Sequence, residues 1–435
     1  MPTVALHTLG CKLNHAETQM IGKQFLDHGF SVVDFGVPAD VVVLNTCSVT
    51  ERAERECRQL IRRSLRSSAD TFVVVTGCYA QLRPEEIASI DGVDVVLGAK
   101  EKFDLFKHAP GLQKSTGGAQ VFVSDIRAAN DFGPAYSTDA GDRTRAYLKI
   151  QDGCDFNCSF CTIPMARGGG RSQSVEECVS QAGVLVNSGY REIVLTGVNV
   201  GDYGRTNGFS LLELLRHVVR IDGLERIRIS SIEPNLFSDE LLEFVASEPR
   251  ICRHFHIPLQ SGHDEILRSM RRRYTTNQYR DLVMRISEKM SGCGIGADVI
   301  VGFPGETDAH FEGTCTFLDE LPVSYLHVFT YSERPDTPAA THKAKVPHGV
   351  RSARNETLRM LSRKKKTAFH RRMVGQTVPV LLENTLDDGQ RFGLTDNYVK
   401  VGVPQEGTVE NSIVDVTILD ATVEFCSGDV STGWA

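Results

Sequence analysis

The first third of the chain alternates apolar runs of strand length with longer stretches of helical spacing. The strand candidates are "TVALHTLG" (3–10), "ADVVVLNTC" (39–47), "TFVVVTGC" (71–78) and "VDVVLGA" (93–99). Between them, 14–30 places Met20, Ile21 and Phe25 on one helical face, and 48–66 and 83–90 are further helix candidates. Nearly continuous Val and Leu runs that alternate with helices are typical of a parallel sheet covered on both faces. We therefore expect an α/β domain with a Rossmann-like parallel sheet.

A second alternation begins after a segment at 109–145 that is rich in Gly, Ser, Asp, Ala and Asn and has no sustained period. Its strand candidates are 146–151, 191–196, 225–231, 253–259, 295–302 and 324–331. Helical stretches separate them at 174–188, 210–221, 238–247, 264–271, 276–292 and 308–320. Successive strand–helix units of this kind predict a whole or partial β/α barrel.

The last part of the chain changes pattern again. A long basic helix is expected at 348–373, and short strands with turn residues between them follow it. These strands predict a small all-β module, most simply a barrel. The expected domains are 1–115, a linker at 116–142, a (β/α)6 barrel at 143–370 and the β module at 373–435.

Composition places the chain among soluble globular proteins. It has 435 residues, of which 41% are hydrophobic and 24% charged. The N-terminus lacks the charged and apolar regions of a signal peptide, and the longest apolar runs are far too short to cross a bilayer. We therefore expect a cytoplasmic protein with no membrane partner.

Charge leaves the nature of the partner open. The formal net charge is −7, yet basic residues gather at 55–66, 268–274 and 359–373. Any one of these clusters alone is best explained as a solvated helix face. Three of them keep a polyanionic partner in consideration.

Three of the twelve cysteines share a position relative to predicted strands. Cys11, Cys47 and Cys78 each follow an apolar run of the first domain. The carboxyl ends of parallel strands form the edge at which α/β sheets bind ligands. Three thiols at that edge could converge on one point, although buried and inert cysteines would give the same pattern.

A second group of cysteines lies in one short loop. "CDFNCSFC" places Cys154, Cys158 and Cys161 at C-x3-C-x2-C spacing, directly after the first barrel strand. A structural zinc needs four ligands. The only other cysteine between residues 130 and 250 is Cys178, which lies inside a predicted helix. A [4Fe–4S] cubane held by three thiolates keeps one iron open, and an open position is what a catalytic metal requires. The six cysteines that belong to neither group are expected to be structural: Cys57, Cys178, Cys252, Cys293, Cys315 and Cys426.

The C-x3-C-x2-C spacing after the first strand of a β/α barrel resembles the radical S-adenosylmethionine (SAM) enzymes. The resemblance implies that the open iron binds SAM and that Phe160 packs near its adenine. Other segments at successive strand ends resemble the SAM-binding motifs of that family: "LTGVN" (195–199), "SSIEP" (230–234), "HIPLQSG" (256–262) and "VIVGFPGET" (299–307). They supply the candidate SAM contacts Thr196, Gly197, Asn199, Ser231, Glu233, Gln260 and Gly302. Local turn formation is the competing explanation for each of them.

The whole chain resembles the methylthiotransferases of the radical SAM group. "TLGCKLN", "LNTCSVT" and "VTGCYAQ" in the first domain match that family, as does a small C-terminal β module. The resemblance implies a second [4Fe–4S] cluster at Cys11, Cys47 and Cys78. It also implies that the C-terminal module is a TRAM domain, which binds RNA. The first-cysteine region looks most like members that act on threonylcarbamoyl-adenosine in tRNA, and members that act on isopentenyl-adenosine or on a ribosomal protein aspartate remain alternatives.

The resemblance also implies the partners. The substrate would be adenosine 37 in a tRNA anticodon loop, the electron donor would be flavodoxin- or ferredoxin-like, and the sulfur donor is left open. Expected phosphate contacts lie in the basic helix and the β module: Arg363, Lys364, Lys365, Lys366, Arg371, Arg372 and Lys400. Arg167 and Arg171 are expected near the barrel mouth, where either could meet a carboxylate or a phosphate. A nucleic-acid-binding protein with structural clusters and no turnover is the rival from another class.

Overall fold

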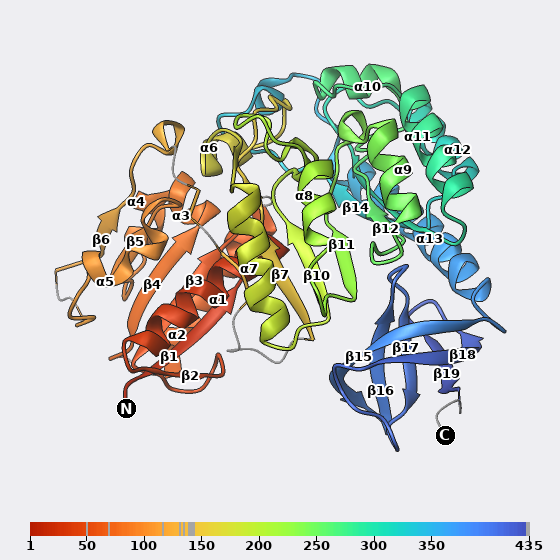
Figure 1. Cartoon of the computed structure of the whole chain (residues 1–435). Coiled ribbons are helices and arrows are strands. Elements are labelled where there is room, and N and C mark those ends of the chain that lie inside the picture. The colour runs from red at the N-terminus through yellow and green to blue at the C-terminus, as the bar shows by residue number, and fades with distance from the viewer. Residues whose placement is uncertain are drawn as a thin grey trace.

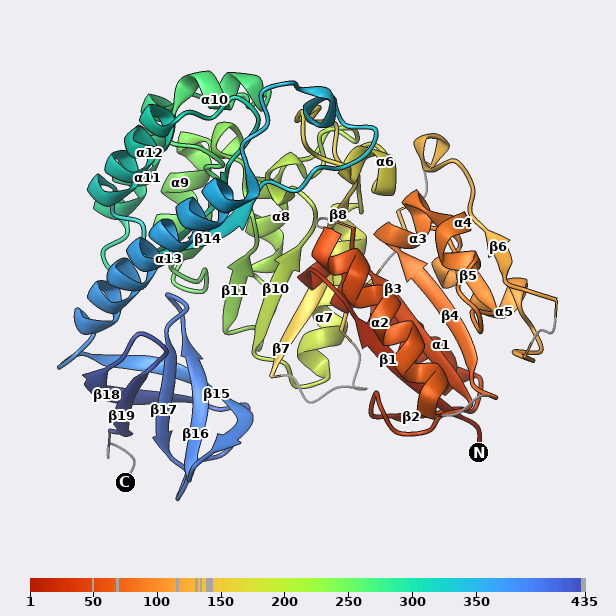
Figure 2. The same cartoon turned by 180° about the vertical axis from the view of Figure 1, so that it is seen from behind.

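A computed structural model describes residues 1–48, 51–67, 70–114, 117–129, 132–133, 135–137 and 144–431. It contains an N-terminal α/β domain, a central arc of strands with helices outside, and a C-terminal β-barrel (Figures 1 and 2). Among the described residues, no helix is long and apolar enough to span a membrane.

The N-terminal domain is built on a parallel sheet of six strands in the order β2-β1-β3-β4-β5-β6. The strands are β1 (Thr3–Thr8), β2 (Ser31–Val33), β3 (Val41–Thr46), β4 (Phe72–Gly77), β5 (Val95–Leu97) and β6 (Gln120–Phe122). The helices are α1 (Lys12–Asp27), α2 (Glu51–Ser67), α3 (Cys78–Leu82), α4 (Pro84–Ala88) and α5 (Leu105–His108). Every residue of β3 and β4 is buried, because helices cover both faces of the sheet. This confirms the parallel α/β domain that the apolar runs predict.

Two strands of this sheet have no counterpart in the sequence pattern. β2 and β6 have three residues each, too few to show a period. β6 lies within the segment expected as a linker, where it pairs with β5 and lengthens the sheet. Residues 116, 130, 131, 134 and 138–142 of that expected linker lie outside the described residues.

The central domain is an arc of six parallel strands. Two three-stranded sheets, β11-β10-β7 and β12-β13-β14, are joined by parallel bridges from Ile227 to Ile251 and from Ser231 to His256. The strands are β7 (Arg145–Lys149), β10 (Glu192–Thr196), β11 (Arg226–Ile229), β12 (His254–His256), β13 (Gly294–Val301) and β14 (Tyr325–Thr330). The helices outside are α7 (Val175–Asn187), α8 (Leu211–Val218), α9 (Asp239–Ser247), α10 (Asp264–Ser269), α11 (Thr276–Lys289) and α12 (Asp308–Glu320). The arc is the partial barrel that the second alternation predicts.

Between β7 and α7, a compact region holds the second cysteine group. It contains the short antiparallel pair β8 (Gln151–Asp152) and β9 (Arg171–Ser172) and the helix α6 (Ile163–Arg167). Helix α1 of the N-terminal domain packs against β7, where Ala16 and Met20 meet Tyr147 and Val194. This contact brings the edge of the N-terminal sheet beside the arc.

The chain ends in a closed barrel of five strands in the order β15-β16-β17-β19-β18. Its strands are β15 (Thr377–Asp387), β16 (Gln390–Thr395), β17 (Lys400–Pro404), β18 (Ile413–Ala421) and β19 (Cys426–Val430). Helix α13 (His348–Arg371) runs along β14 and leads into the barrel. The barrel lies at the end of the arc where the parallel strands begin (Figure 1). It is consistent with the small TRAM-like module expected from the sequence.

Candidate active site

The three N-terminal cysteines lie at adjacent strand ends on the carboxyl edge of the sheet. Cys11 caps α1 after β1, Cys47 follows β3, and Cys78 begins α3 directly after β4. β1 and β4 both pair with β3, so the three strand ends are neighbours. The N-termini of α1 and α3 lie at this edge, where their dipoles favour a thiolate, whereas burial raises the pKa of the Cys11 thiol.

Two glycines allow this close approach. Gly10 has a φ of +102°, and a Cβ built on it would lie 2.8 Å from Cys47 Cβ and 2.9 Å from Cys47 Sγ. Gly77 has a φ of +98°, and its Cβ would lie 2.4 Å from the carbonyl oxygen of Thr46. Only glycine fits both the backbone angle and the space. The glycines therefore hold Cys11 and Cys78 beside Cys47.

Arg167 reaches this edge from the central domain. Its guanidinium lies within electrostatic range of the thiols of Cys11 and Cys78. It donates to Glu17 Oε1 at 3.0 Å, to Asp152 Oδ1 at 2.9 Å and to Asn14 Oδ1. Burial alone would lower the pKa of Arg167, but Glu17 and the Cys78 thiol outweigh burial and hold that pKa well above its usual value. Only 2% of Arg167 is exposed, and the carboxylates that its guanidinium meets in this structure are those of Glu17 and Asp152.

Arg171, the other arginine of the Gly-rich segment, is also occupied. It donates to the carbonyl oxygens of Arg167 and Gly169 at 2.8 and 2.9 Å, and its Nη2 lies 3.7 Å from Asp152. It therefore stiffens the loop that follows α6.

The second cysteine group folds into one loop after β8. Gly153 has a φ of +67°, and a Cβ there would lie 2.0 Å from the carbonyl oxygen of Gly169. The backbone N–H of Cys154 donates to Gly168 at 3.0 Å and closes the loop. Burial raises the pKa of Cys154 and of Cys161 to about 12, so a bound cation is needed to keep these thiols ionised at neutral pH.

Two donors point at the sulfurs of this loop. The backbone N–H of Phe156 lies 3.4 Å from Cys154 Sγ, and Arg272 Nη1 lies 3.1 Å from Cys158 Sγ. Arg272 is held by an ion pair with Glu233 and by a bond from Nε to the Tyr274 hydroxyl at 3.1 Å. Sequence reasoning misses Arg272, because it lies in the basic stretch 268–274, whose pattern indicates only a possible polyanion contact. Glu233, one of the predicted SAM contacts, is therefore paired with Arg272 in this structure.

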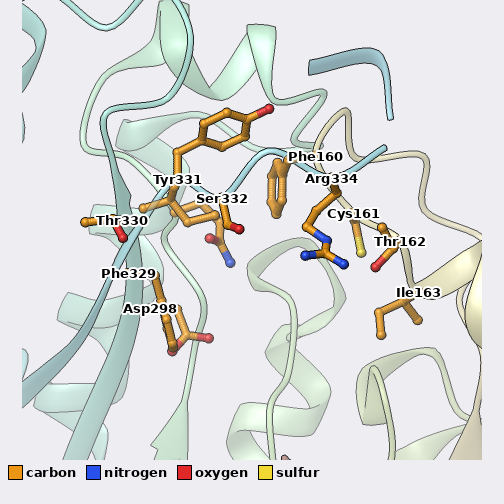
Figure 3. A pocket seen from close by; sticks show the side chains of 12 residues that line it. Phe160, Cys161, Thr162, Ile163, Asp298, Phe329, Thr330, Tyr331, Ser332 and Arg334 are labelled. Atoms are coloured by element: carbon orange, nitrogen blue, oxygen red, sulfur yellow. The ribbon is translucent and has the colours of Figure 1, made fainter. Parts of the chain in front are cut away.

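A cavity opens beside Cys161. It lies between the cysteine loop and β14 (Figure 3). Phe160, Ile163, Phe329 and Tyr331 provide apolar and aromatic walls, and Gln260 and Asp298 add polar groups. An aromatic pocket with a few convergent polar groups is typical of a cofactor site. The structure thus brings Phe160 and Gln260 to this cavity, as the SAM assignment requires.

Asn199 carries unsatisfied polar atoms. It is 4% exposed, and neither its side-chain oxygen nor its nitrogen has a partner among the described residues. Its backbone N–H donates to Gln151 Oε1 at 2.9 Å, which fixes it at the end of β10. The hydroxyl of Tyr331, at the cavity wall, has no described partner either. Buried polar atoms without a hydrogen-bond partner are consistent with a polar ligand such as SAM.

The other predicted SAM contacts, like Asn199 and Glu233, lie near strand ends and are not among the residues that line the cavity. Thr196 accepts from Ile150, and Gly197 packs against Gln151. Ser231 bridges to β12. Gly302, with a φ of +72°, packs against Arg351 and donates to Glu306 at 2.8 Å. These four therefore shape the backbone around the site in the structure.

Comparison with known proteins identifies the family. Residues 148–318 match the radical SAM superfamily, and residues 3–98 match a family described as "Uncharacterized protein family UPF0004". The threonylcarbamoyladenosine tRNA methylthiotransferase MtaB of Bacillus subtilis (strain 168) is 40% identical over 98% of this chain and 96% of its own. The chain belongs to the radical SAM methylthiotransferase family. It is therefore an enzyme of the transferase class.

Two further likenesses bear on this assignment. The tRNA-2-methylthio-N(6)-dimethylallyladenosine synthase of Ehrlichia chaffeensis (strain Arkansas) is 32% identical over 99% of this chain and 100% of its own. The radical SAM methyltransferase TsrM of Kitasatospora setae, solved with tryptophan and aza-SAM, shares the fold, with a TM-score of 0.58 at 17% identity. That likeness covers 78% of this chain and 75% of TsrM.

The cofactors of the methylthiotransferases are two [4Fe–4S] clusters and SAM. The present residues fit them. Each cysteine group would supply three thiolates to a cubane and would leave one iron without a protein thiolate. The cavity beside Cys161 would offer a place for SAM, and the unsatisfied amide of Asn199, which is not among the residues that line this cavity, would offer a further polar contact.

The basic residues of this methylthiotransferase differ in their availability. Lys366 and Lys400 line a groove between α13, β14 and the C-terminal barrel, together with His327 and Tyr398. Arg363, Lys364 and Arg371 line a second, shallower hollow on α13. The ammonium of Lys365 donates to the carbonyl oxygens of Asp319 and Leu321 at 3.0 and 2.8 Å, and the guanidinium of Arg372 stacks over Phe369. Lys366 and Lys400 both line the groove, and the ammonium of Lys400 also lies 4.0 Å from the centroid of the Phe392 ring.

Proposed function

We propose that this methylthiotransferase acts on tRNA and places a methylthio group on C2 of N6-threonylcarbamoyl-adenosine at position 37. The relatives in which this activity is named are 33–40% identical to the chain. The relatives named for the dimethylallyl substrate are 32–35% identical, so that substrate is the alternative.

The observation that supports the proposal is the arrangement of two groups of three cysteines, one at adjacent strand ends of the N-terminal sheet and one in the loop after β8. Cys154, Cys158 and Cys161 would hold the cluster that works with SAM, and Cys11, Cys47 and Cys78 would hold the auxiliary cluster. Bound SAM and the two clusters supply the radical and sulfur chemistry that an unactivated aromatic C–H requires and that no side chain performs. A protein with clusters of purely structural purpose has no need of two open sites.

The chain's own residues have distinct parts in this scheme. The amide of Asn199 would hydrogen-bond SAM, and the walls of Phe160, Ile163 and Phe329 would keep water from the reacting centre. The guanidinium of Arg167 would fix the distance between the two cysteine sites, because it touches residues of both domains. Precise placement of reacting groups is itself a large part of catalysis.

The RNA would be held at a distance from the chemistry. Lys366 and Lys400 would contact backbone phosphates in the groove beside α13, and single-stranded loop bases are open to be drawn out of their stack. Electrons would come from a flavodoxin- or ferredoxin-like donor.

A reaction with purified components tests the proposal. The anaerobically prepared enzyme with both clusters is given SAM, a chemical reductant and an anticodon stem–loop that carries either threonylcarbamoyl-adenosine or isopentenyl-adenosine at position 37. The proposal expects the methylthio product from the first RNA by nucleoside mass spectrometry. Product from the second RNA alone would make the isopentenyl type correct. 5′-Deoxyadenosine without any methylthio-nucleoside would exclude both RNA substrates.

A further inference from the structure

The floor of the central arc is built by all three domains. The turn between β16 and β17 inserts Tyr398 beneath the strands, with a left-handed φ of +70°. The Tyr398 ring stacks on His254 with centroids 4.4 Å apart. The guanidinium of Arg228, on β11, lies 5.1 Å from the same ring, and the ammonium of Lys12 lies 5.6 Å from it.

The turn is fixed to the arc by several bonds. Arg228 donates to the carbonyl oxygens of Thr395 and Asp396 at 3.1 and 2.9 Å. Arg253 pairs with the Asp396 carboxylate at 2.7 Å, and Asn397 donates to Gly292 at 3.0 Å. The ring of Tyr398 is therefore a fixed part of the floor.

This floor carries more positive than negative side chains. Arg228 binds Glu192 through Nε at 2.7 Å and Nη2 at 3.2 Å, and Arg226 shares the same carboxylate at 3.9 Å. Arg145 pairs with Glu383 at 2.9 Å. The fourth cation of the group, Lys12, is half-buried and has no carboxylate partner within 4 Å among the residues that the structure describes. A cation enclosed by three domains without a counter-ion points to an anionic ligand.

The place of Lys12 in the chain links this ligand to the reaction. Lys12 directly follows Cys11 and is the first residue of α1, whose N-terminal dipole also favours an anion. In adenine, C2 and the carbon that carries N6 both flank N1. A base that presents C2 to the site of Cys11 therefore brings its N6 substituent close to the same site. The threonylcarbamoyl group ends in a carboxylate.

We propose that the ammonium of Lys12 binds the carboxylate of the threonylcarbamoyl group above the Tyr398 floor, and so selects the substrate. This inference rests on the proposed function and adds the residue that recognises its substrate. A backbone phosphate is the other source of negative charge in the RNA. Lys12 directly follows Cys11, the site to which C2 of the base would be presented, which favours a group carried on that base over the backbone in the groove of Lys366 and Lys400.

Binding and turnover with chemically varied RNAs test the inference in the holoenzyme. Three anticodon stem–loops are compared at one salt concentration: one with threonylcarbamoyl-adenosine, one with its uncharged methyl ester, and one with unmodified adenosine. The native enzyme is compared with Lys12→Gln. Lys23→Gln is the matched control, because Lys23 lies on the exposed side of the same helix in a surface pair with Asp27.

The expected result is selective. Lys12→Gln should weaken binding of the threonylcarbamoyl RNA by about 10- to 100-fold and leave binding of the methyl ester and unmodified RNAs within about twofold. The native enzyme should prefer the charged RNA over its ester by a similar factor, which Lys12→Gln should abolish. Lys23→Gln should behave as the native enzyme.

Each other outcome overturns the inference. An equal loss on all three RNAs would assign Lys12 to a phosphate, and no loss would leave it without a role in recognition. If the Lys12→Gln variant lost its iron, the test would rest on the native enzyme, which should still bind the threonylcarbamoyl RNA more tightly than its methyl ester. Equal methylthiolation of acid and ester by the native enzyme would overturn the inference while the proposed function stands, whereas no product from either would overturn the proposed function.

Discussion

Glu17 of helix α1 and Arg167 of helix α6 face each other across the boundary between the N-terminal and central domains. Arg167 Nη1 lies 3.0 Å from Glu17 Oε1, and Nη2 lies 3.1 Å from Oε2. The side chain of Glu17 is fully buried, and Lys102 and Lys149 also bond to it, at 2.5 and 3.3 Å. Arg167 ends the helix that follows the second cysteine group, and its guanidinium lies within electrostatic range of Cys11 and Cys78, so this pair links one group to the other.

Replacing Glu17 by Gln should destabilise the protein strongly. The change leaves Arg167, Lys102 and Lys149 with the carboxylate of Asp152 alone to balance them. Breaking a buried ion network from one side costs about 3–5 kcal/mol, and we expect a loss of that size in the free energy of unfolding by urea. The surface variant Lys23→Gln should change it by less than about 1 kcal/mol. A similar small effect at Glu17 would mean that the network does not hold the domains.

The same network predicts a dependence on pH. Burial alone would raise the pKa of Glu17, but Arg167, Lys102 and Lys149 outweigh it and hold the pKa well below its usual range. The unfolded chain therefore takes up a proton at Glu17 at a higher pH than the folded protein does. Its stabilisation is complete above about pH 5 and is lost progressively as the pH falls below that.

Thermal unfolding of the metal-free protein from pH 7 to pH 4 measures this effect. The difference in midpoint between the native protein and Glu17→Gln should be largest at pH 7 and should shrink below about pH 5. The metal-free form avoids acid loss of iron. A difference that stays constant over this range would contradict the assigned direction of the pKa.

Replacing Cys47 by Ala should separate the two functions of the enzyme. Reductive cleavage of SAM should remain largely intact, because Cys154, Cys158 and Cys161 are untouched, whereas sulfur transfer should be lost. Bound iron should fall by about four atoms per chain, the content of one cubane. Cys57→Ala is the matched control, since Cys57 is a fully buried cysteine in the same domain. Loss of 5′-deoxyadenosine formation with an intact second cluster would contradict the assignment.

Replacing Arg272 by Gln should change the cluster that Cys158 would hold. Hydrogen bonds from positive donors to cluster sulfurs raise the reduction potential, and Arg272 donates to Cys158 Sγ. We expect a more negative midpoint potential in a redox titration followed by electron paramagnetic resonance. Arg271→Gln controls for the loss of a charge, because Arg271 is exposed on the same turn. An unchanged potential in Arg272→Gln would show that its bond to Cys158 does not persist when iron is bound.

The sequence predicts those parts of the molecule that depend on local pattern. The buried strands β3 and β4 and the cysteine loop are such parts, because continuous apolar runs and short Cys spacing leave few other structures. The grouping of Cys11, Cys47 and Cys78 also follows from parallel topology, which places all strand carboxyl ends at one edge. The structure confirms that these strand ends are adjacent.

Other features depend on packing between distant segments. Arg167 has the sequence context of an exposed residue in a Gly-rich loop, and only the approach of α1 buries it against Glu17. Arg272 belongs to a charge run, and only the loop geometry shows that it points at Cys158. The enclosure of Lys12 needs Tyr398 from the other end of the chain. Spacing along the sequence carries no information on such contacts.

The most direct test of the proposed function is nucleoside mass spectrometry of tRNA from cells of the source organism with and without the gene. The account predicts that 2-methylthio-N6-threonylcarbamoyl-adenosine disappears on deletion, that its unmethylthiolated precursor accumulates, and that the native gene restores the product while the Cys47→Ala gene does not. Unchanged 2-methylthio-N6-threonylcarbamoyl-adenosine in the deletion strain would contradict it.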